Sequence, residues 1–168
     1  MTLKTYWKEI PFLNNFFLKQ LSVNRNKIHN IFVNKINYND NLSILNIGTA
    51  STLDKNHNTI LQKLDNNFNI TCLSNQNCNL LKEEYRNVKS FIQADALENN
   101  LENENFDVVY SSATIEHVGS IERQTAFVSE CLRLSKKYVF ITTPNRFFPL
   151  DFHTKIPLLH FLPKKFTE

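Results

Sequence analysis

Short apolar runs alternate with segments of helical periodicity along most of this chain, and this alternation restricts the fold more than any other feature. Strands that alternate with helices of this length build βαβ units. The sequence therefore predicts an α/β fold with an open, doubly wound, mainly parallel sheet and helices on both faces. The expected strands are residues 43–47, 69–73, 88–92, 106–111 and 138–142, and the expected helices between them are about 53–64, 78–85 and 121–134.

The segments on either side of this alternating core have a different character. Residues 5–37 carry apolar side chains three and four positions apart, as in Phe12 and Phe16 and then Ile28 and Phe32, which predicts two amphipathic helices. Most of the prolines fall near the C-terminus, where long regular elements are not expected. We predict three regions: N-terminal helices packed on the domain (1–40), the core (41–143) and a Pro- and Phe-rich tail (144–168).

Charge and cysteine content argue against several classes of protein. The 19 basic and 16 acidic residues are spread along the chain without a basic stripe, so nucleic acid is not an expected partner. Cys72, Cys78 and Cys131 are an odd number without a C-x-x-C pair, which predicts neither disulfides nor zinc and favours a reducing cytoplasm. No apolar run approaches the roughly 20 residues that span a bilayer, so no membrane span is expected.

Candidate functional residues follow the predicted strands, because ligands of an open parallel sheet bind beyond the carboxyl ends of its strands. Gly48 follows the first strand, where a glycine permits a sharp turn and close approach of a ligand; the alternative is a simple strand-ending turn. Ser74 follows the second strand, where adenosine sites usually place an acid for the ribose hydroxyls. Asp95 follows the third strand and is either an acceptor for an exocyclic amine or the side chain of a helix N-cap or an Asx turn.

Glu116 and His117 lie in the segment that follows the fourth strand. Adjacent acid and imidazole groups can act as a general acid or base, and we take these two residues as the catalytic candidates. The alternative is a structural histidine held by a backbone carbonyl.

In this order, the stretches ILNIGTA, QADA, FDVVYSSATIEHV and KKYVFITTPNRFFP resemble class I S-adenosylmethionine-dependent methyltransferases, over residues 40–163. The strongest match is Asp107 at the start of the fourth strand, followed by a small-residue turn and Ile-Glu-His. The resemblance implies a Rossmann-like sheet in the spatial order 3-2-1-4-5, S-adenosylmethionine as cofactor and a small-molecule acceptor.

The resemblance also implies a cofactor site. In such enzymes the first loop holds the methionine part of the cofactor, the acid after the second strand holds ribose, and the acid after the third meets adenine. Some quinone-pathway relatives use Glu-x-x-Glu-His for a metal, but the first position here is Ala113, so no metal is predicted. The residues implied at the cofactor are Asn46, Gly48, Thr49, Ala50, Ser74, Asp95, Ala96, Ser111 and Ser112.

The first loop departs from the family pattern, which usually reads acid-x-Gly-x-Gly-x-Gly. This chain has Asn46, Gly48, Ala50 and Thr52 at these positions, and Ser74 replaces the ribose acid. The leading hypothesis is an S-adenosylmethionine-dependent methyltransferase. These departures favour an alternative, a catalytically inactive methyltransferase-like binding or assembly module. A nicotinamide-dependent reductase ranks third, because both its glycine fingerprint and its ribose acid are absent.

The end of the predicted sheet also differs from the family. The family sheet normally ends with an antiparallel hairpin, and this sequence stops near where that hairpin would begin, either because it is cut short or because the protein ends there. The edge of strand 138–142 would then be open, and we expect the apolar tail or a second copy of the chain to cover it. The other interpretation of the tail is a substrate lid or an interaction surface.

Overall fold

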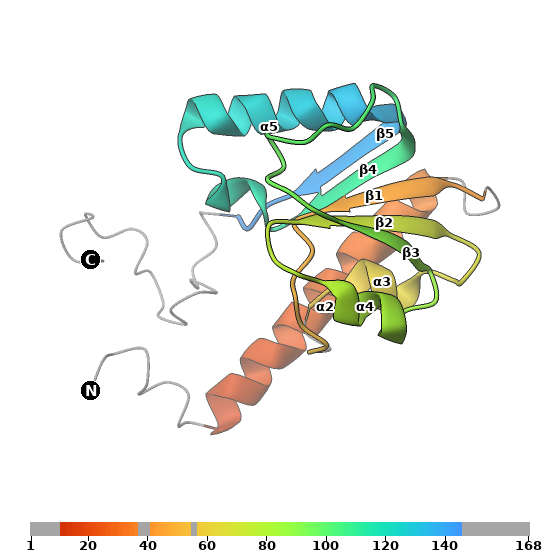
Figure 1. The fold of residues 1–168 in the computed structure, drawn as a ribbon. Coiled ribbons are helices and arrows are strands. Elements are labelled where there is room, and N and C mark those ends of the chain that lie inside the picture. The colour runs from red at the N-terminus through yellow and green to blue at the C-terminus, as the bar shows by residue number, and fades with distance from the viewer. Residues whose placement is uncertain (1–10, 37–40, 55–56, 146–168) are drawn as a thin grey trace. The chain divides into compact units, whose positions relative to one another are not determined.

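The computed structural model of the chain describes residues 11–36, 41–54 and 57–145 (Figure 1). By its internal contacts the chain divides into two units. One unit is residues 24–143, which hold the sheet. The other is residues 1–23 with 144–168, of which the structure describes 11–23 and 144–145. The main elements are α2 (Pro11–Lys35), β1 (Ser43–Ile47), α3 (Thr59–Lys63), β2 (Asn69–Ser74), α4 (Asn79–Glu84), β3 (Val88–Gln93), β4 (Phe106–Ser112), α5 (Ile121–Leu134) and β5 (Ser135–Thr142).

The five strands form one sheet in the order β3-β2-β1-β4-β5, and every neighbouring pair is parallel. This confirms the predicted fold class and strand order. Because β1 lies between β2 and β4, the chain runs outward from β1 in both directions, and the order reverses at that point (Figure 1). A topological switch point of this kind opens a crevice at the carboxyl ends of the strands.

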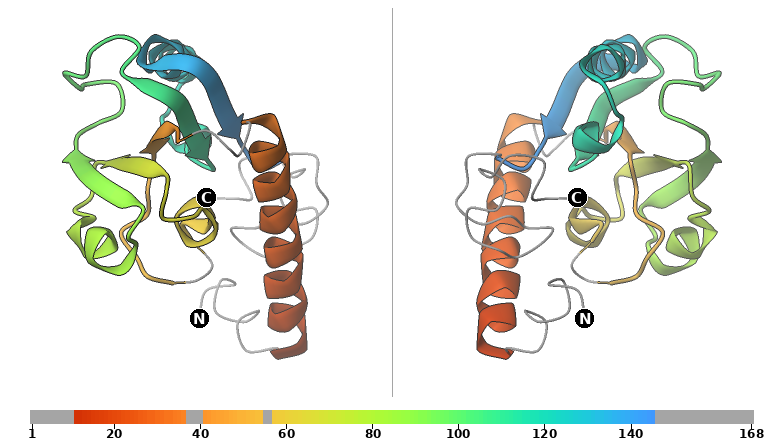
Figure 2. Two further views of the ribbon diagram at one scale, coloured as in Figure 1. Left: turned by 90° about the vertical axis from the view of Figure 1, so that its right-hand side faces the viewer. Right: turned by 90° about the vertical axis from the view of Figure 1, so that its left-hand side faces the viewer.

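Alternate residues of the central strand pack against different helices. Ile44 belongs to a core cluster with Phe32 of α2 and Leu61 of α3. Leu45 belongs to a second cluster with Phe127 of α5. In residues 24–143, the C-terminal half of α2 together with α3 and α4 therefore covers one face of the sheet, and α5 covers the other (Figure 2). Helices on both faces are the arrangement that the sequence predicts.

The helix α2 differs from the prediction. Residues 11–35 form one unbroken helix of 25 residues, where the sequence analysis expected two. No proline or glycine separates the two apolar sets, so nothing interrupts the backbone hydrogen bonds between them. Near its C-terminal end, Phe32 packs edge-on against Tyr110 and Phe140, with ring centroids 5.0 and 5.1 Å apart.

The helix α3 is shorter than predicted. It covers only Thr59–Lys63, and the residue before it, Asn58, has left-handed backbone angles. The segment 50–54 that precedes it is a loop rather than a first helical turn. The sequence pattern placed the helix correctly but not its start.

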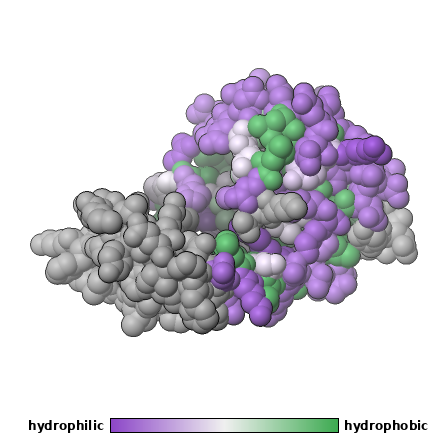
Figure 3. Space-filling model, turned by 90° about the horizontal axis from the view of Figure 1, so that it is seen from below, coloured by the Kyte–Doolittle hydropathy of each residue, from purple (hydrophilic) through white to green (hydrophobic). Residues whose placement is uncertain are grey.

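One face of the described part of the chain is largely polar. The face in Figure 3 is mostly hydrophilic, and its apolar residues form small separate areas. None of the helices in the described residues is both long and apolar enough to cross a membrane. The predicted tail, apart from residues 144–145, lies outside the described residues, and so does the expected cover for the edge of β5.

Candidate functional site

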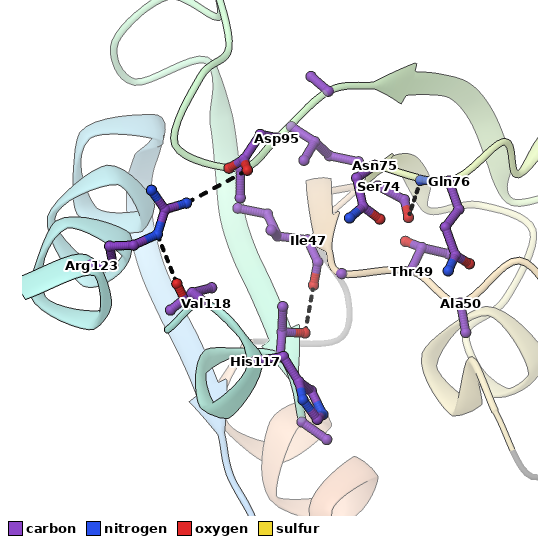
Figure 4. Close-up of a pocket in the computed structure, with 16 residues that line it drawn as sticks. Ile47, Thr49, Ala50, Ser74, Asn75, Gln76, Asp95, His117, Val118 and Arg123 are labelled. Atoms are coloured by element: carbon purple, nitrogen blue, oxygen red, sulfur yellow. Dashed lines mark hydrogen bonds and ion pairs between the residues drawn. The ribbon is translucent and has the colours of Figure 1, made fainter. Parts of the chain in front are cut away.

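A pocket of about 370 Å³ lies at the carboxyl ends of the central strands (Figure 4). Small-molecule sites usually enclose about 300–1,000 Å³, and they favour topological switch points. Size and place both mark this pocket as the candidate site. Its walls are Ile47, Gly48, Thr49 and Ala50 at the end of β1, Leu73, Ser74, Asn75 and Gln76 at the end of β2, Ala94, Asp95 and Ala96 after β3, Ala113, Thr114, His117 and Val118 after β4, and Arg123 of α5.

Gly48 makes the turn at the end of β1. Its φ is +82°, and a Cβ built on it would lie 2.1 Å from Oγ1 of Thr114. Its N–H donates a hydrogen bond of 2.9 Å to the carbonyl of Leu73. Both the backbone angle and the neighbouring side chain therefore require a glycine at this position, as the sequence analysis expected.

The loop after Gly48 is unstrained although it lacks the family glycines. Ala50 and Thr52 are not among the described residues with positive φ, so neither side chain is forced into the left-handed region. Several N–H groups of the loop already have acceptors: that of Ala50 donates to Oδ1 of Asn58 (3.1 Å), and that of Thr52 donates to the carbonyl of Ala50 (2.9 Å). The loop therefore forms a wall of the pocket, and the N–H groups of Ala50 and Thr52 are already paired within the chain.

Neutral polar groups line the pocket at the end of β2. Ser74 is buried, and its Oγ accepts a 3.2 Å hydrogen bond from the N–H of Gln76. Asn75 and Gln76 continue this wall. This side of the pocket therefore carries a hydroxyl beside two amides and no carboxylate.

Asp95 and Arg123 form the charged side of the pocket. Oδ1 of Asp95 accepts a 2.8 Å hydrogen bond from the N–H of Leu97, which is the Asx turn considered from the sequence. Oδ2 lies 3.7 Å from Nη2 of Arg123, whose Nε donates to the carbonyl of Val118 (2.8 Å). Both side chains are about half exposed, at 47% and 50%, so this ion pair contributes little to stability. The ion pair holds the Asp95 carboxylate at the wall of the pocket (Figure 4).

His117 and Glu116 lie in a short 3-10 helix that follows β4. His117 lines the pocket, whereas Glu116 does not. Oε2 of Glu116 accepts a 3.2 Å hydrogen bond from Oγ1 of Thr143, and Oε1 lies 4.0 Å from Nε2 of His117. At 4.0 Å the carboxylate is within ion-pair range of the imidazole but beyond hydrogen-bonding distance.

The described residues outside this pocket offer little other chemistry. The three cysteine side chains are buried, and burial raises the pKa of the Cys72 thiol to about 11 and that of Cys131 to about 12. Thiols with such pKa values are poor nucleophiles at neutral pH. Within the described part of the chain, no group of three or more His, Cys, Asp or Glu side chains could hold a metal ion.

A profile of the family described as "Methyltransferase domain" matches residues 54–141, more than half of the chain. This chain belongs to that family. The match confirms the resemblance drawn from the sequence motifs. It begins after Gly48, so it rests on the segment from α3 to β5 and not on the altered first loop.

Solved methyltransferase structures resemble this domain. Coclaurine N-methyltransferase, bound to N-methylheliamine and S-adenosylhomocysteine, is 16% identical with a TM-score of 0.52, and the match covers 70% of this chain and 35% of that one. An S-adenosylmethionine-dependent methyltransferase from Methanosarcina mazei is 18% identical (TM-score 0.49; 62% and 54% covered). A further one from Methanococcus maripaludis, described as putative, is 15% identical (TM-score 0.48; 87% and 67% covered).

These likenesses concern the fold. The chain spans about half the length of the Methanosarcina protein and about a third of coclaurine N-methyltransferase. No curated protein matches the sequence. For this methyltransferase domain, the similarity to coclaurine N-methyltransferase supports the Rossmann-like architecture.

The methyltransferase pocket gathers six of the nine residues expected at the cofactor: Gly48, Thr49, Ala50, Ser74, Asp95 and Ala96. Asn46, Ser111 and Ser112 do not line it. Asn46 is buried, and its carbonyl accepts a hydrogen bond from Oγ1 of Thr49 (3.0 Å). Ser111 is fully buried and donates to the carbonyl of Ile47 (3.1 Å), and Ser112 hydrogen-bonds with Oγ1 of Thr142 (2.9 Å). A role of these three residues at the cofactor stays a prediction.

Several pocket residues of this domain were not expected from the sequence. Arg123 lies in the first turn of α5 and reaches the pocket only because its side chain folds back onto Val118. Thr114 lies against Gly48, and Gln76 donates its N–H to Ser74. A basic residue in the first turn of the helix that follows β4 is the one sequence signal that could have indicated Arg123.

Proposed function

We propose that this domain transfers a methyl group from S-adenosylmethionine to a small-molecule acceptor. The observation that carries the proposal is the convergence of Gly48, Ser74 and Asp95, from the ends of three neighbouring strands, on one pocket in a member of the methyltransferase family. The sequence expected these residues at the cofactor, and the switch point of the sheet is where a nucleoside binds in such folds.

The lining of the pocket fits an adenosine-containing cofactor. The Asp95 carboxylate is an acceptor suited to an exocyclic amine, and Arg123 restrains it at the wall. Ala94, Ala96 and Val118, which line the pocket and are partly exposed, supply apolar surface for the faces of a base. The hydroxyl of Ser74 supplies one hydrogen bond to ribose, without the charge-assisted pair that a carboxylate gives. We place the methionine part toward the loop at Ala50.

The chain's own residues then align the acceptor and handle its proton. When bound, S-adenosylmethionine supplies a methyl group on a positively charged sulfur, so the protein needs no nucleophile of its own. Holding the acceptor in line is the main contribution of the pocket walls. His117, which lines the pocket, would accept a proton from an acceptor hydroxyl or amine.

Binding of S-adenosylhomocysteine tests this proposal directly. We expect the folded protein to bind it in titration calorimetry. The Asp95→Ala variant should bind about 5- to 150-fold more weakly, because a buried donor that loses its partner costs about 1–3 kcal/mol. Glu83→Ala, which removes an exposed carboxylate of α4 outside the pocket, should bind like wild type. An Asp95→Ala variant with unchanged affinity would contradict the placement of adenine.

The alternative is a methyltransferase-like module that binds a partner without catalysis. The internal pairing of the Ala50 and Thr52 N–H groups favours it, together with the neutral Ser74. If the folded wild-type protein binds neither S-adenosylmethionine nor S-adenosylhomocysteine at millimolar concentration, this alternative replaces the methyltransferase. A cytoplasmic location, inferred from the cysteine pattern, belongs to either proposal.

A further inference from the structure

The side chain of Asn58 holds the loop that forms one wall of the pocket. Its Oδ1 accepts a hydrogen bond from the N–H of Ala50 (3.1 Å), and its Nδ2 donates to the carbonyls of Ala50 (2.8 Å) and Thr52 (3.1 Å). One amide thus satisfies both backbone polar groups of Ala50 and one of Thr52. Among short side chains, only an asparagine offers an acceptor and two donors at the same tip.

Capping of α3 does not explain these hydrogen bonds. Asn58 occupies the N-cap position of α3 with φ +51°, but its side chain makes no capping hydrogen bond. The N–H groups of Leu61 and Gln62 donate to its backbone carbonyl instead (2.9 and 3.3 Å). A residue that only capped the helix would turn its side chain toward the first helical N–H groups. The Asn58 amide turns toward the loop instead.

These hydrogen bonds link Asn58 to the pocket through the backbone of the loop. Ala50 lines the pocket, whereas Asn58 lies behind it and does not. In the family pattern, further glycines follow Gly48 and let the backbone pass close to the cofactor. Here Ala50 and Thr52 stand at those positions. The Asn58 amide fixes the backbone path that glycines would otherwise permit.

We propose that Asn58 is a positioning residue for the amino-acid part of the cofactor, and that it acts by holding the wall formed by Ala50–Thr52. This inference rests on the proposed function, because it assumes that S-adenosylmethionine occupies the pocket with its methionine part at this loop. Asn58 does not touch the ligand. Loss of its amide releases the loop, so a ligand that reaches the loop loses affinity, and a ligand that ends at the ribose does not.

The test compares two ligands on matched variants by titration calorimetry. S-adenosylhomocysteine carries the amino-acid part, and 5′-methylthioadenosine lacks it. The variant Asn58→Gly keeps the left-handed backbone and removes the amide. We expect it to bind S-adenosylhomocysteine about tenfold more weakly, the equivalent of about one or two lost hydrogen bonds. Its affinity for 5′-methylthioadenosine should stay within about twofold of wild type.

Asn87→Gly is the matched control. The amide of Asn87 also binds the region of α3, donating to the carbonyls of Leu61 (2.9 Å) and Leu64 (2.8 Å), but it does not line the pocket. It should lower thermal stability and leave the ratio of the two affinities unchanged. If Asn58→Gly does not fold, Asn58→Asp, which keeps the acceptor and loses both donors, gives the same comparison.

The outcomes separate this inference from the proposed function. Wild-type protein that binds neither ligand overturns the proposed function, and this inference with it. Wild-type binding with an unchanged affinity ratio in the Asn58 variant overturns this inference alone. An equal loss of affinity for both ligands also overturns this inference, because such a loss indicates a general structural role for Asn58.

Discussion

Two residues next to the central strands have left-handed backbone conformations. Gly48 follows β1 and has a φ of +82°, and Ala113 follows β4 and has a φ of +54°. Only the first is a glycine. An alanine in this region costs about 1–2 kcal/mol, a strain that persists where surrounding contacts determine the backbone. The N–H of Ala113 donates to the carbonyl of Thr142 (2.9 Å), which extends the pairing of β4 with β5 and holds the residue there. Both residues line the pocket.

Gly48→Ala should lower the free energy of unfolding by more than about 2 kcal/mol, since both a left-handed backbone and a steric clash oppose the new methyl group. The clash is with Oγ1 of Thr114, only 2.1 Å from the Cβ position. Urea unfolding followed by circular dichroism measures the change. Gly119→Ala is the control: its φ is also positive (+107°), but its nearest contact would be Cδ of Arg123 at 3.4 Å. Equal losses in the two variants would show that the clash contributes nothing.

At the scale of single residues, the sequence predicted the pocket positions that lie at strand ends. Gly48, Ser74 and Asp95 all come at or just after the end of a strand, so the parallel topology alone brings them together. Arg123 and Asn58 could not be found in this way. Their roles depend on side chains that fold back onto Val118 and the Ala50–Thr52 loop, and such contacts leave no periodic signal in the sequence.

At the scale of elements, the strands were predicted within a few residues, and the helices less well. The burial of β1 and β4 is nearly continuous, and so an apolar run is enough to identify them. The start of α3 is set by the left-handed Asn58, and the length of α2 by the lack of any residue that breaks a helix. Local backbone conformation at the ends decides helix boundaries, and periodicity does not report it.

Phe32→Ala tests how the C-terminal half of α2 is attached to the sheet. Phe32 is fully buried against Tyr110 and Phe140, so its truncation should cost about 3–5 kcal/mol of unfolding free energy. Chemical denaturation measures this loss. The neighbouring Ile31 is 44% exposed, and Ile31→Ala should cost much less, about 1 kcal/mol or below. Similar losses for the two variants would contradict the packing described for this helix.

At the scale of the whole molecule, Asp107 connects the beginnings of three strands. Its Oδ2 accepts hydrogen bonds from the N–H (3.0 Å) and Oγ (2.8 Å) of Ser43 at the start of β1, and its Oδ1 lies 3.3 Å from Nζ of Lys137 on β5. It lies in β4, at the opposite end of the strand from the pocket. The acid that gave the strongest family match is therefore structural: it holds the strand order that creates the switch point.

The stability of the protein should depend on the charge of Asp107. Burial alone would raise the pKa of this carboxyl, but the hydrogen bonds from Ser43 and the ammonium of Lys137 outweigh it and lower the pKa below its usual value. A carboxyl whose pKa is lower in the folded state stabilises the protein above its unfolded pKa of about 3.9, and this contribution is lost as the pH falls through the folded value. The charged form is therefore the one that the fold stabilises.

Asp107→Asn should be less stable than wild type at pH 7, and the difference should shrink as the pH falls below about 4, because wild type then loses the same charge. Urea unfolding at pH 7, 5 and 3 measures the two stabilities. Glu104→Gln, which neutralises an exposed acid in the loop before β4, is the control and should follow wild type at each pH. A difference between Asp107→Asn and wild type that stays constant from pH 7 to 3 would show that the geometry of the hydrogen bonds, and not the charge of the carboxylate, joins β1, β4 and β5.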